Sequence, residues 1–207
     1  IFLQKGFSVI KVNFRGVGKS DGVFDNGQGE LSDAAAALDW IERQNLDYSQ
    51  CWVSGFSFGS LICMQLIMRR PEVNNFIAVS PQPNVYDFSF LAPCPTSGQV
   101  VYSENDELVT KESIIELDNR IKSQKGVEVI FSKIKGANHF FKEKEKELRI
   151  EVEKYRLGLD VNFRHLSLPP ISLARSILRC LFSTISKVGC RITRIHYETA
   201  FNFSRRT

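Results

Sequence analysis

A serine flanked by glycines two positions away on either side is the first feature of this sequence that could do chemistry. Gly55-Phe56-Ser57-Phe58-Gly59 follows a short apolar stretch and opens directly into a longer one. In a strand–turn–helix context this spacing makes a tight turn that exposes the serine hydroxyl at the edge of a sheet. We interpret Ser57 as a nucleophile and the backbone N–H of Phe58 as a donor to a developing oxyanion. The alternative is an ordinary turn rich in glycine and serine.

A nucleophilic serine needs a base, and histidine is the usual one. His139 lies in Gly136-Ala-Asn-His-Phe-Phe141, just after the last strand expected in the body of the chain. The other two histidines, His165 and His196, lie in an irregular C-terminal region. We therefore favour His139 as the base over the alternative, a surface imidazole without a function.

The base in turn needs a carboxylate that orients it. Asp106 lies in an acidic turn after an expected strand, so its side chain belongs to the same sheet edge as Ser57. The order serine, aspartate, histidine along the chain is one that serine hydrolases use. Glu104 and Glu107 are nearby competitors, Asp87 is a more distant one, and a solvated acidic turn is the alternative.

Short apolar strands alternate with helices along the body of the chain. We expect strands at 7–14, 51–54, 76–79, 99–102 and 127–131, and helices at 32–45, 58–70, 110–121 and 141–156, with Thr110 as the cap of the third helix. This alternation predicts an α/β fold with a mostly parallel sheet, helices on both faces and right-handed crossovers.

Charge divides the chain into two parts. Residues 1–157 hold 19 Lys and Arg against 21 Asp and Glu, whereas residues 158–207 hold 8 against 2. The body is thus too acidic for a nucleic-acid-binding protein. We expect one domain over 1–157 and a basic, disordered or weakly helical tail over 158–207. A basic amphipathic helix over 171–188 that lies on an anionic membrane is the alternative for the tail.

Composition excludes several classes of protein. Hydrophobic residues make up 43% and charged residues 24% of the 207, values that exclude disorder, collagen and coiled coil for the whole chain. Apolar runs are too short for an integral membrane segment. The five cysteines are scattered, which indicates reduced thiols and a cytoplasmic location and no metal site. No cofactor is expected, and a homo-oligomer remains open.

Two further segments invite an interpretation. Gly16-Val-Gly-Lys-Ser20 imitates a phosphate-binding loop, but Asn13 stands where that loop needs glycine, so we expect an ordinary turn. The proline-rich loop 81–97 carries Tyr86, Phe88, Phe90 and Leu91. These side chains are candidates for the wall of an acyl pocket, for a satellite of the core or for a dimer contact.

At these motifs residues 1–157 resemble the α/β-hydrolase superfamily, and more narrowly the small bacterial hydrolases without a cap that lie near dienelactone hydrolase. The resemblance rests on segment 13–22, Gly55–Gly59, the turn at Asp106 and segment 136–140. It implies hydrolysis of an ester, thioester or lactone through an acyl-serine. Ser57 would be the nucleophile, His139 the general base and then acid, and Asp106 the group that orients it.

The sequence departs from this family at its beginning. Ile1 reads as the end of a helix that runs into a strand, so we expect an upstream part to be missing. In the family that part supplies a second oxyanion donor and a strand between the first and second strands of this chain. We therefore expect a gap in the sheet beside the strand of the nucleophile.

Three functions follow as hypotheses. The first is a serine hydrolase that acts on small carboxylic esters or related acyl compounds, with a small-molecule substrate as its partner. The second is an inert remnant of the fold that serves as a binding scaffold, which the expected gap favours. The third, a nucleotide-binding protein, depends on the imperfect loop at Gly16 alone.

Overall fold

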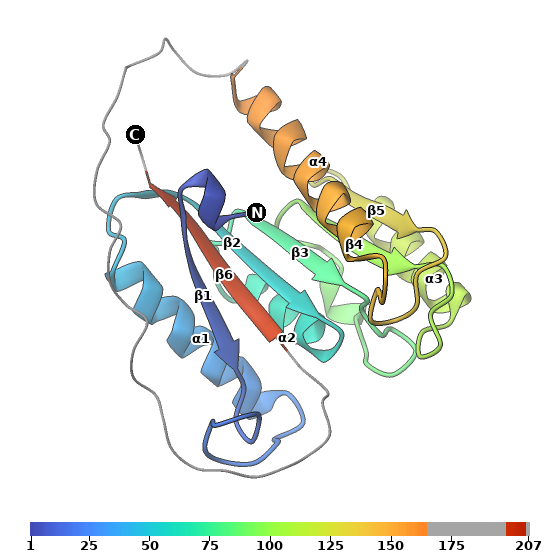
Figure 1. Cartoon of the computed structure of the whole chain (residues 1–207), viewed down its shortest axis with the longest axis horizontal. Helices are drawn as coiled ribbons and strands as arrows, with labels where there is room; N and C mark the ends of the chain where they lie inside the picture. Colours follow the sequence, from blue (N-terminus) through green and yellow to red (C-terminus); the bar gives the residue numbers. More distant parts are fainter. Residues whose placement is uncertain (165–197, 206–207) are drawn as a thin grey trace.

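Six strands form a single sheet in a computed structural model that describes residues 1–164 and 198–205, with side chains described as far as residue 158. The order across the sheet is β1-β6-β2-β3-β4-β5 (Figure 1). From β2 to β5 all neighbours are parallel. The strands are β1 (Phe7–Asn13), β2 (Tyr48–Phe56), β3 (Asn75–Val79), β4 (Gly98–Ser103), β5 (Val129–Ile134) and β6 (Glu198–Arg205).

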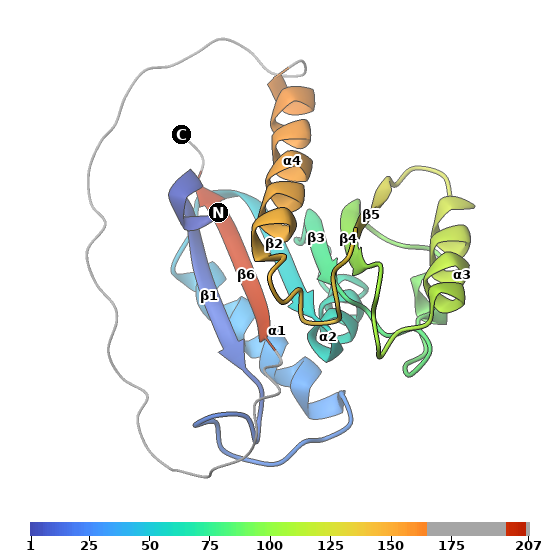
Figure 2. The ribbon, with the colours of Figure 1, turned by 45° about the vertical axis from the view of Figure 1, so that its right-hand side comes forward.

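Helices cover both faces of this sheet. The elements are α1 (Gln28–Arg43), α2 (Phe58–Ile67), α3 (Lys111–Lys122), α4 (Glu145–Arg164) and the short 3₁₀ turns η1 (Leu3–Lys5) and η2 (Ser89–Leu91). One buried cluster takes side chains from α1, α2 and α3, whereas a second takes Val152 and Tyr155 from α4. In Figure 2 α4 stands on the opposite side of the sheet from α1 and α2. The predicted α/β fold class is confirmed.

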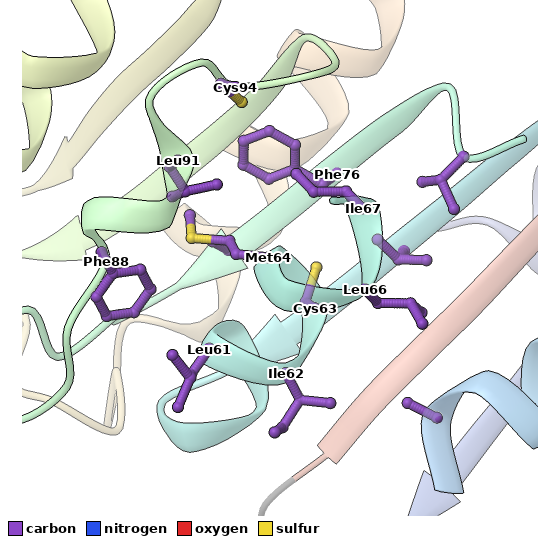
Figure 3. Packing of buried hydrophobic residues seen from close by; sticks show 14 of the residues in the cluster. Leu61, Ile62, Cys63, Met64, Leu66, Ile67, Phe76, Phe88, Leu91 and Cys94 are labelled. Carbon is purple, nitrogen blue, oxygen red and sulfur yellow. The ribbon is translucent and has the colours of Figure 1, made fainter. Parts of the chain in front are cut away.

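Helix α2 is the centre of the larger cluster. Nine of its ten residues are buried, which explains why its sequence is apolar on every side instead of amphipathic. Figure 3 shows Met64 of this helix beside Phe88 and Leu91 of the loop after β3 and Phe76 of β3. Phe88 and Leu91 of that loop are 2% and 0% exposed, so both are core residues and not a pocket wall. Tyr86 and Phe90 are only partly buried.

Helix α1 begins four residues before its predicted start. The buried carboxylate of Glu30 accepts hydrogen bonds from the backbone N–H of Asp25 and of Gly27, both at 2.8 Å. These two bonds satisfy donors ahead of the helix, a capping role that Glu at this position commonly has. The start therefore lies near Gly27 and not at Ser32.

Helix α4 is shifted in the opposite direction. Phe141 and Glu143 adopt positive φ angles of 53° and 63°, so residues 141–144 form turns and the helix starts at Glu145. It then continues to Arg164, across the boundary expected at residue 157. The tail helix expected as an alternative over 171–188 lies outside the described residues, as do His165 and His196.

The expected gap beside the nucleophile strand is filled. Strand β6 lies antiparallel between β1 and β2, with Asn13 opposite Glu198 and Gly55 opposite Thr199 (Figure 1). Without it both neighbours would present a row of backbone N–H and C=O groups with no strand to pair with, which is the arrangement that recruits a strand. The prediction of an empty position is thus wrong, and the segment that fills it was expected to be tail.

None of the helices within the two described ranges has the length and apolar composition that a membrane crossing requires.

The Glu30 carboxylate gives a first prediction. We expect Glu30→Ala to lower the free energy of unfolding by about 1–3 kcal/mol, because it leaves two backbone donors without their acceptor at a buried position. Urea unfolding measures this loss. Glu112→Ala is the matched control, since Glu112 is exposed in the first turn of α3 and should cost less than about 1 kcal/mol. Equal losses would contradict the capping role.

The cysteines give a second prediction. Cys51, Cys63 and Cys94 are free and buried, and burial raises the pKa of each thiol. The thiolate is the reactive form, so we expect iodoacetamide at pH 8 to label these three only after denaturation. Peptide mapping by mass spectrometry, with and without urea, measures the labelling. Rapid labelling of Cys63 in the native protein would show that the core around α2 opens.

Candidate active site

Ser57 sits in a strained turn between β2 and α2. Its φ of 53° and ψ of −119° lie outside the regions that a residue with a side chain normally occupies. Its backbone N–H donates to the carbonyl of Val79 at 2.8 Å, which ties the turn to β3. A Cβ on Gly55 would lie 2.0 Å from the carbonyl oxygen of Gly59. The glycine at 55 is therefore required by the close approach of strand and helix.

The three side chains singled out in the sequence come together at the edge where β2, β4 and β5 end. The Oγ of Ser57 lies 3.0 Å from Nε2 of His139. Nδ1 of the same ring lies 3.0 Å from both carboxylate oxygens of Asp106. Ser57 is 5% and His139 1% exposed, so the contacts are shielded from water. The arrangement allows a proton to pass from Oγ to a ring whose orientation Asp106 fixes.

Asp106 is held as a carboxylate by its donors. Burial alone would raise its pKa, but hydrogen bonds from His139, from the Leu108 N–H and from the Ser103 hydroxyl outweigh burial and lower the pKa below its ordinary value. The Ser103 bond is 2.8 Å long and the Leu108 bond 2.9 Å. Ser103 is a site residue that the sequence analysis missed, since a serine at the end of a strand carries no signal of its own.

The competing carboxylates have other partners. Glu107 accepts the backbone N–H of His139 at 3.0 Å, so it fixes the loop of the histidine and not the ring. Glu104 accepts the N–H of Gly136 and pairs with Lys133. Asp87 lies in the loop after β3, where it binds Ser89. Among the four acidic candidates, the structure thus brings Asp106 to the imidazole.

Phe58 follows Ser57 in the chain, and its ring lies at the centre of an aromatic cluster. It makes edge or tilted contacts with Phe14, Phe24 and Tyr86, with centroids 6.1, 5.3 and 5.7 Å away. Its backbone N–H lies in the first turn of α2, where the helix carries partial positive charge. Phe24 is 53% exposed and was not foreseen as a neighbour of the site.

A further missed residue, Gln82, touches the candidate nucleophile directly. The side-chain carboxamide of Gln82 lies with Oε1 3.2 Å from Oγ of Ser57. Gln82 follows β3 and stands between Pro81 and Pro83. A glutamine between two prolines has no recognised chemical signature, so only the register of β2 against β3 reveals this contact.

Two other expectations concern bound groups. After Lys19 and Ser20 the chain continues through further turns, and α1 begins only at Gln28, so no helix opens at the imitation of a phosphate-binding loop. Ser20 instead donates to the carbonyl of Asn13 at 2.8 Å. Over the residues with described side chains, no group of three His, Cys, Asp or Glu is placed to hold a metal ion.

Comparison with known proteins identifies the family to which this chain belongs. The family model of X-Pro dipeptidyl-peptidase (S15 family) matches residues 1–131, a range that contains Ser57 and Asp106 and ends before His139. An uncharacterized protein from Rickettsia prowazekii (strain Madrid E) is 44% identical over 169 residues, which are 80% of this chain and 71% of that protein.

Solved structures agree with the fold. A protein of unknown function from Agrobacterium tumefaciens is 47% identical with a TM-score of 0.69, over 77% of this chain and 72% of that one. An alpha-beta serine hydrolase homologue from Coxiella burnetii is 35% identical with a TM-score of 0.62, over 69% of this chain and 66% of that one. The resemblance to α/β-hydrolases inferred from the motifs is confirmed.

The turn at Ser57 gives a third prediction. We expect Gly55→Ala to destabilise the fold and to abolish any reactivity of Ser57, because a methyl group would overlap the carbonyl of Gly59. Gly158→Ala is the matched control. A Cβ there meets nothing within 4 Å, and alanine should stabilise α4 by about 1 kcal/mol. Thermal unfolding of both variants measures the contrast, and a Gly55→Ala protein as stable as the parent would contradict it.

The lowered pKa of Asp106 gives a fourth prediction. A carboxyl whose pKa is lower in the folded state stabilises the fold above its unfolded value of about 4, and this contribution disappears as the pH falls through the folded value. We therefore expect Asp106→Asn to be less stable than the parent at pH 7 and the difference to shrink below about pH 4. Urea unfolding across this range measures it. A difference independent of pH would contradict the assignment, and Asp47→Asn, in an exposed turn, is the reference.

Proposed function

Because this chain belongs to the X-Pro dipeptidyl-peptidase (S15) family of α/β-hydrolases, it is a hydrolase by descent, and we propose that it cleaves small carboxylic esters through an acyl-serine intermediate. The observation that carries this proposal is the continuous set of contacts from Asp106 through His139 to Oγ of Ser57, each 3.0 Å long. Ser57 is the proposed nucleophile, His139 the proposed base and Asp106 the group that orients the ring.

The proposed reaction has two halves. In the first, Oγ of Ser57 bonds to the acyl carbon and its proton passes to Nε2 of His139. The ring then gives this proton to the alcohol oxygen as the carbon–oxygen bond of the ester breaks. In the second half water bonds to the acyl carbon and loses a proton to His139. The ring returns this proton to Oγ of Ser57 as the bond between Oγ and the acyl carbon breaks, and the acid leaves. Asp106 stays ionised throughout and stabilises the imidazolium, which agrees with its lowered pKa.

The developing oxyanion needs hydrogen-bond donors. We assign the backbone N–H of Phe58 to this role, since it is the first residue of α2 and follows the nucleophile. The positive end of the helix dipole adds to its effect. The hydroxyl of Ser57 and this amide belong to consecutive residues at the start of α2, so we assign both to the same carbonyl group of the substrate.

Small substrates are proposed because of the loop after β3. This loop runs from Ser80 to Ser97, and Phe88 and Leu91 anchor it in the core. A loop that is packed in this way does not close over the nucleophile as a lid. A site that this loop leaves open favours short acyl and alcohol groups, because little of the described part of the chain encloses a longer one.

Cleavage of peptides is the second candidate, because the matching family is named for an X-Pro dipeptidyl-peptidase. Such a substrate carries a free ammonium group near the scissile bond, which calls for a carboxylate beside the nucleophile. Among the residues whose side chains the structure describes, those that contact Oγ of Ser57 are the imidazole of His139 and the neutral amide of Gln82. Neither is a carboxylate, so we rank esters above N-terminal dipeptides.

A fifth prediction tests the nucleophile. We expect a fluorophosphonate to form one covalent adduct on Ser57, located by mass spectrometry of peptides, and p-nitrophenyl acetate to be hydrolysed. Ser57→Ala should abolish both, and His139→Ala should slow both by roughly 10⁴-fold or more because the base is lost. A Gly-Pro-p-nitroanilide substrate, run in parallel, reports peptidase activity.

Three results would contradict parts of the proposal. A folded protein that forms no adduct would favour the inert binding scaffold. Faster cleavage of the anilide than of the ester would favour the peptidase. Undiminished ester hydrolysis by Asp106→Asn, where roughly a 10⁴-fold loss of turnover is expected, would remove Asp106 from the mechanism.

A further inference from the structure

The carboxamide of Gln82 touches the nucleophile but has no part in the reaction proposed above. Oγ of Ser57 carries a single proton, and two acceptors face it, His139 Nε2 at 3.0 Å and Gln82 Oε1 at 3.2 Å. The hydroxyl donates to only one of them at a time. A half turn about the terminal torsion of Gln82 exchanges Oε1 and Nε2, and the amide then donates to Oγ while Oγ donates to His139.

The framework around Gln82 is built to hold this side chain. Pro81 and Pro83 restrict the backbone on both sides of it. Its carbonyl accepts the N–H of Val85 at 3.0 Å and of Tyr86 at 2.9 Å, which closes the turn. The backbone of Gln82, from which the side-chain carboxamide extends, is therefore held in place just after the end of β3.

The same turn is tied to the loop of the acid. Asn84 donates from Nδ2 to the carbonyl of Leu108 at 2.9 Å, and the N–H of Leu108 donates to Asp106. At the other end of the turn, the Ser80 hydroxyl donates to the carbonyl of His139 at 3.2 Å. The turn that carries Gln82 is thus tied both to the loop of the acid and to the loop of the base.

We propose that Gln82 is a substrate-binding residue that selects acyl groups with a hydroxyl on the carbon next to the scissile carbonyl. After acylation Oγ of Ser57 is an ester oxygen with no proton, so Oε1 of the amide loses its hydrogen-bond donor there. The groups nearest to Oγ are then the acyl oxygen, assigned to Phe58, and the substituents of the next carbon. This inference rests on the proposed function, because the ester hydrolysis rates that it predicts require the acyl-serine intermediate.

A hydroxyl at that carbon suits a carboxamide because each group both donates and accepts. In one orientation of the amide the substrate hydroxyl accepts a hydrogen bond from Nε2 of Gln82. In the other orientation it donates a hydrogen bond to Oε1. An unsubstituted acyl chain leaves the amide without a partner in a partly buried position. A site built for a hydrogen bond rejects the analogue that lacks it.

Paired substrates of equal chain length test this assignment. We expect the p-nitrophenyl ester of 2-hydroxybutyrate to exceed that of butyrate by roughly 10-fold in kcat/KM, corrected for spontaneous hydrolysis. In Gln82→Met, which keeps the length and removes both polar atoms, this ratio should fall to about one. Gln44→Met is the control, since Gln44 is exposed at the end of α1, and it should keep the ratio.

A binding readout separates this inference from the proposed function. 2-Hydroxybutyrate should raise the melting temperature of the parent more than butyrate does, and Gln82→Met should remove the difference. Selective stabilisation without ester turnover would retain the role of Gln82 and overturn the serine hydrolase. Turnover with a ratio that Gln82→Met leaves unchanged, or an equal loss with both esters, would overturn the role of Gln82.

Discussion

The backbone conformation of Ser57 is the constraint on which the site depends. A positive φ at a residue with a side chain costs about 1–3 kcal/mol, and the surrounding structure has to hold it in place. Three features do so here: the bond from its N–H to Val79, the contact of Gly55 with Gly59, and the burial of α2 on nearly every side. A helix that is buried on nearly every side cannot rotate to relieve the strain, which is why an apolar α2 follows the strained serine.

Parallel strands place the remaining groups. Each of four consecutive strands delivers one side chain beyond its carboxyl end: Ser57 after β2, Gln82 after β3, Asp106 after β4 and His139 after β5. Because the strands are neighbours in that order, residues 82 positions apart in the chain meet at one edge. The loops also bond to one another, as when the N–H of Asn105 donates to the carbonyl of Ala137 at 2.9 Å, so the geometry belongs to the whole edge.

Short sequence patterns predict the fold class and several residues of the candidate site. The spacing around Ser57 and the strand–helix alternation identify the fold class and bring out Asp106 and His139, because each lies in a turn after an apolar run. Gln82 stayed hidden, since its contact depends on strand register and no local pattern encodes register. Strand β6 stayed hidden for a related reason. It pairs with β1 and β2 because both strands have an edge without a partner. The sequence of 198–205 alone does not indicate which strands of the sheet lack a partner.

Strand β6 also has a consequence for the order in which the chain acquires its structure. Within the described elements β1 pairs with β6 alone. Residues 7–13 are therefore connected to the rest of the sheet only through residues 198–205. Contacts between residues near 10 and residues near 200 have the largest loop to close, and such topologies fold slowly. While a ribosome is still making residues 165–197, β2 to β5 can assemble, but β1 waits with an exposed edge. The edges of β1 and β2 are therefore most vulnerable to aggregation until residues 198–205 have left the ribosome and paired with them.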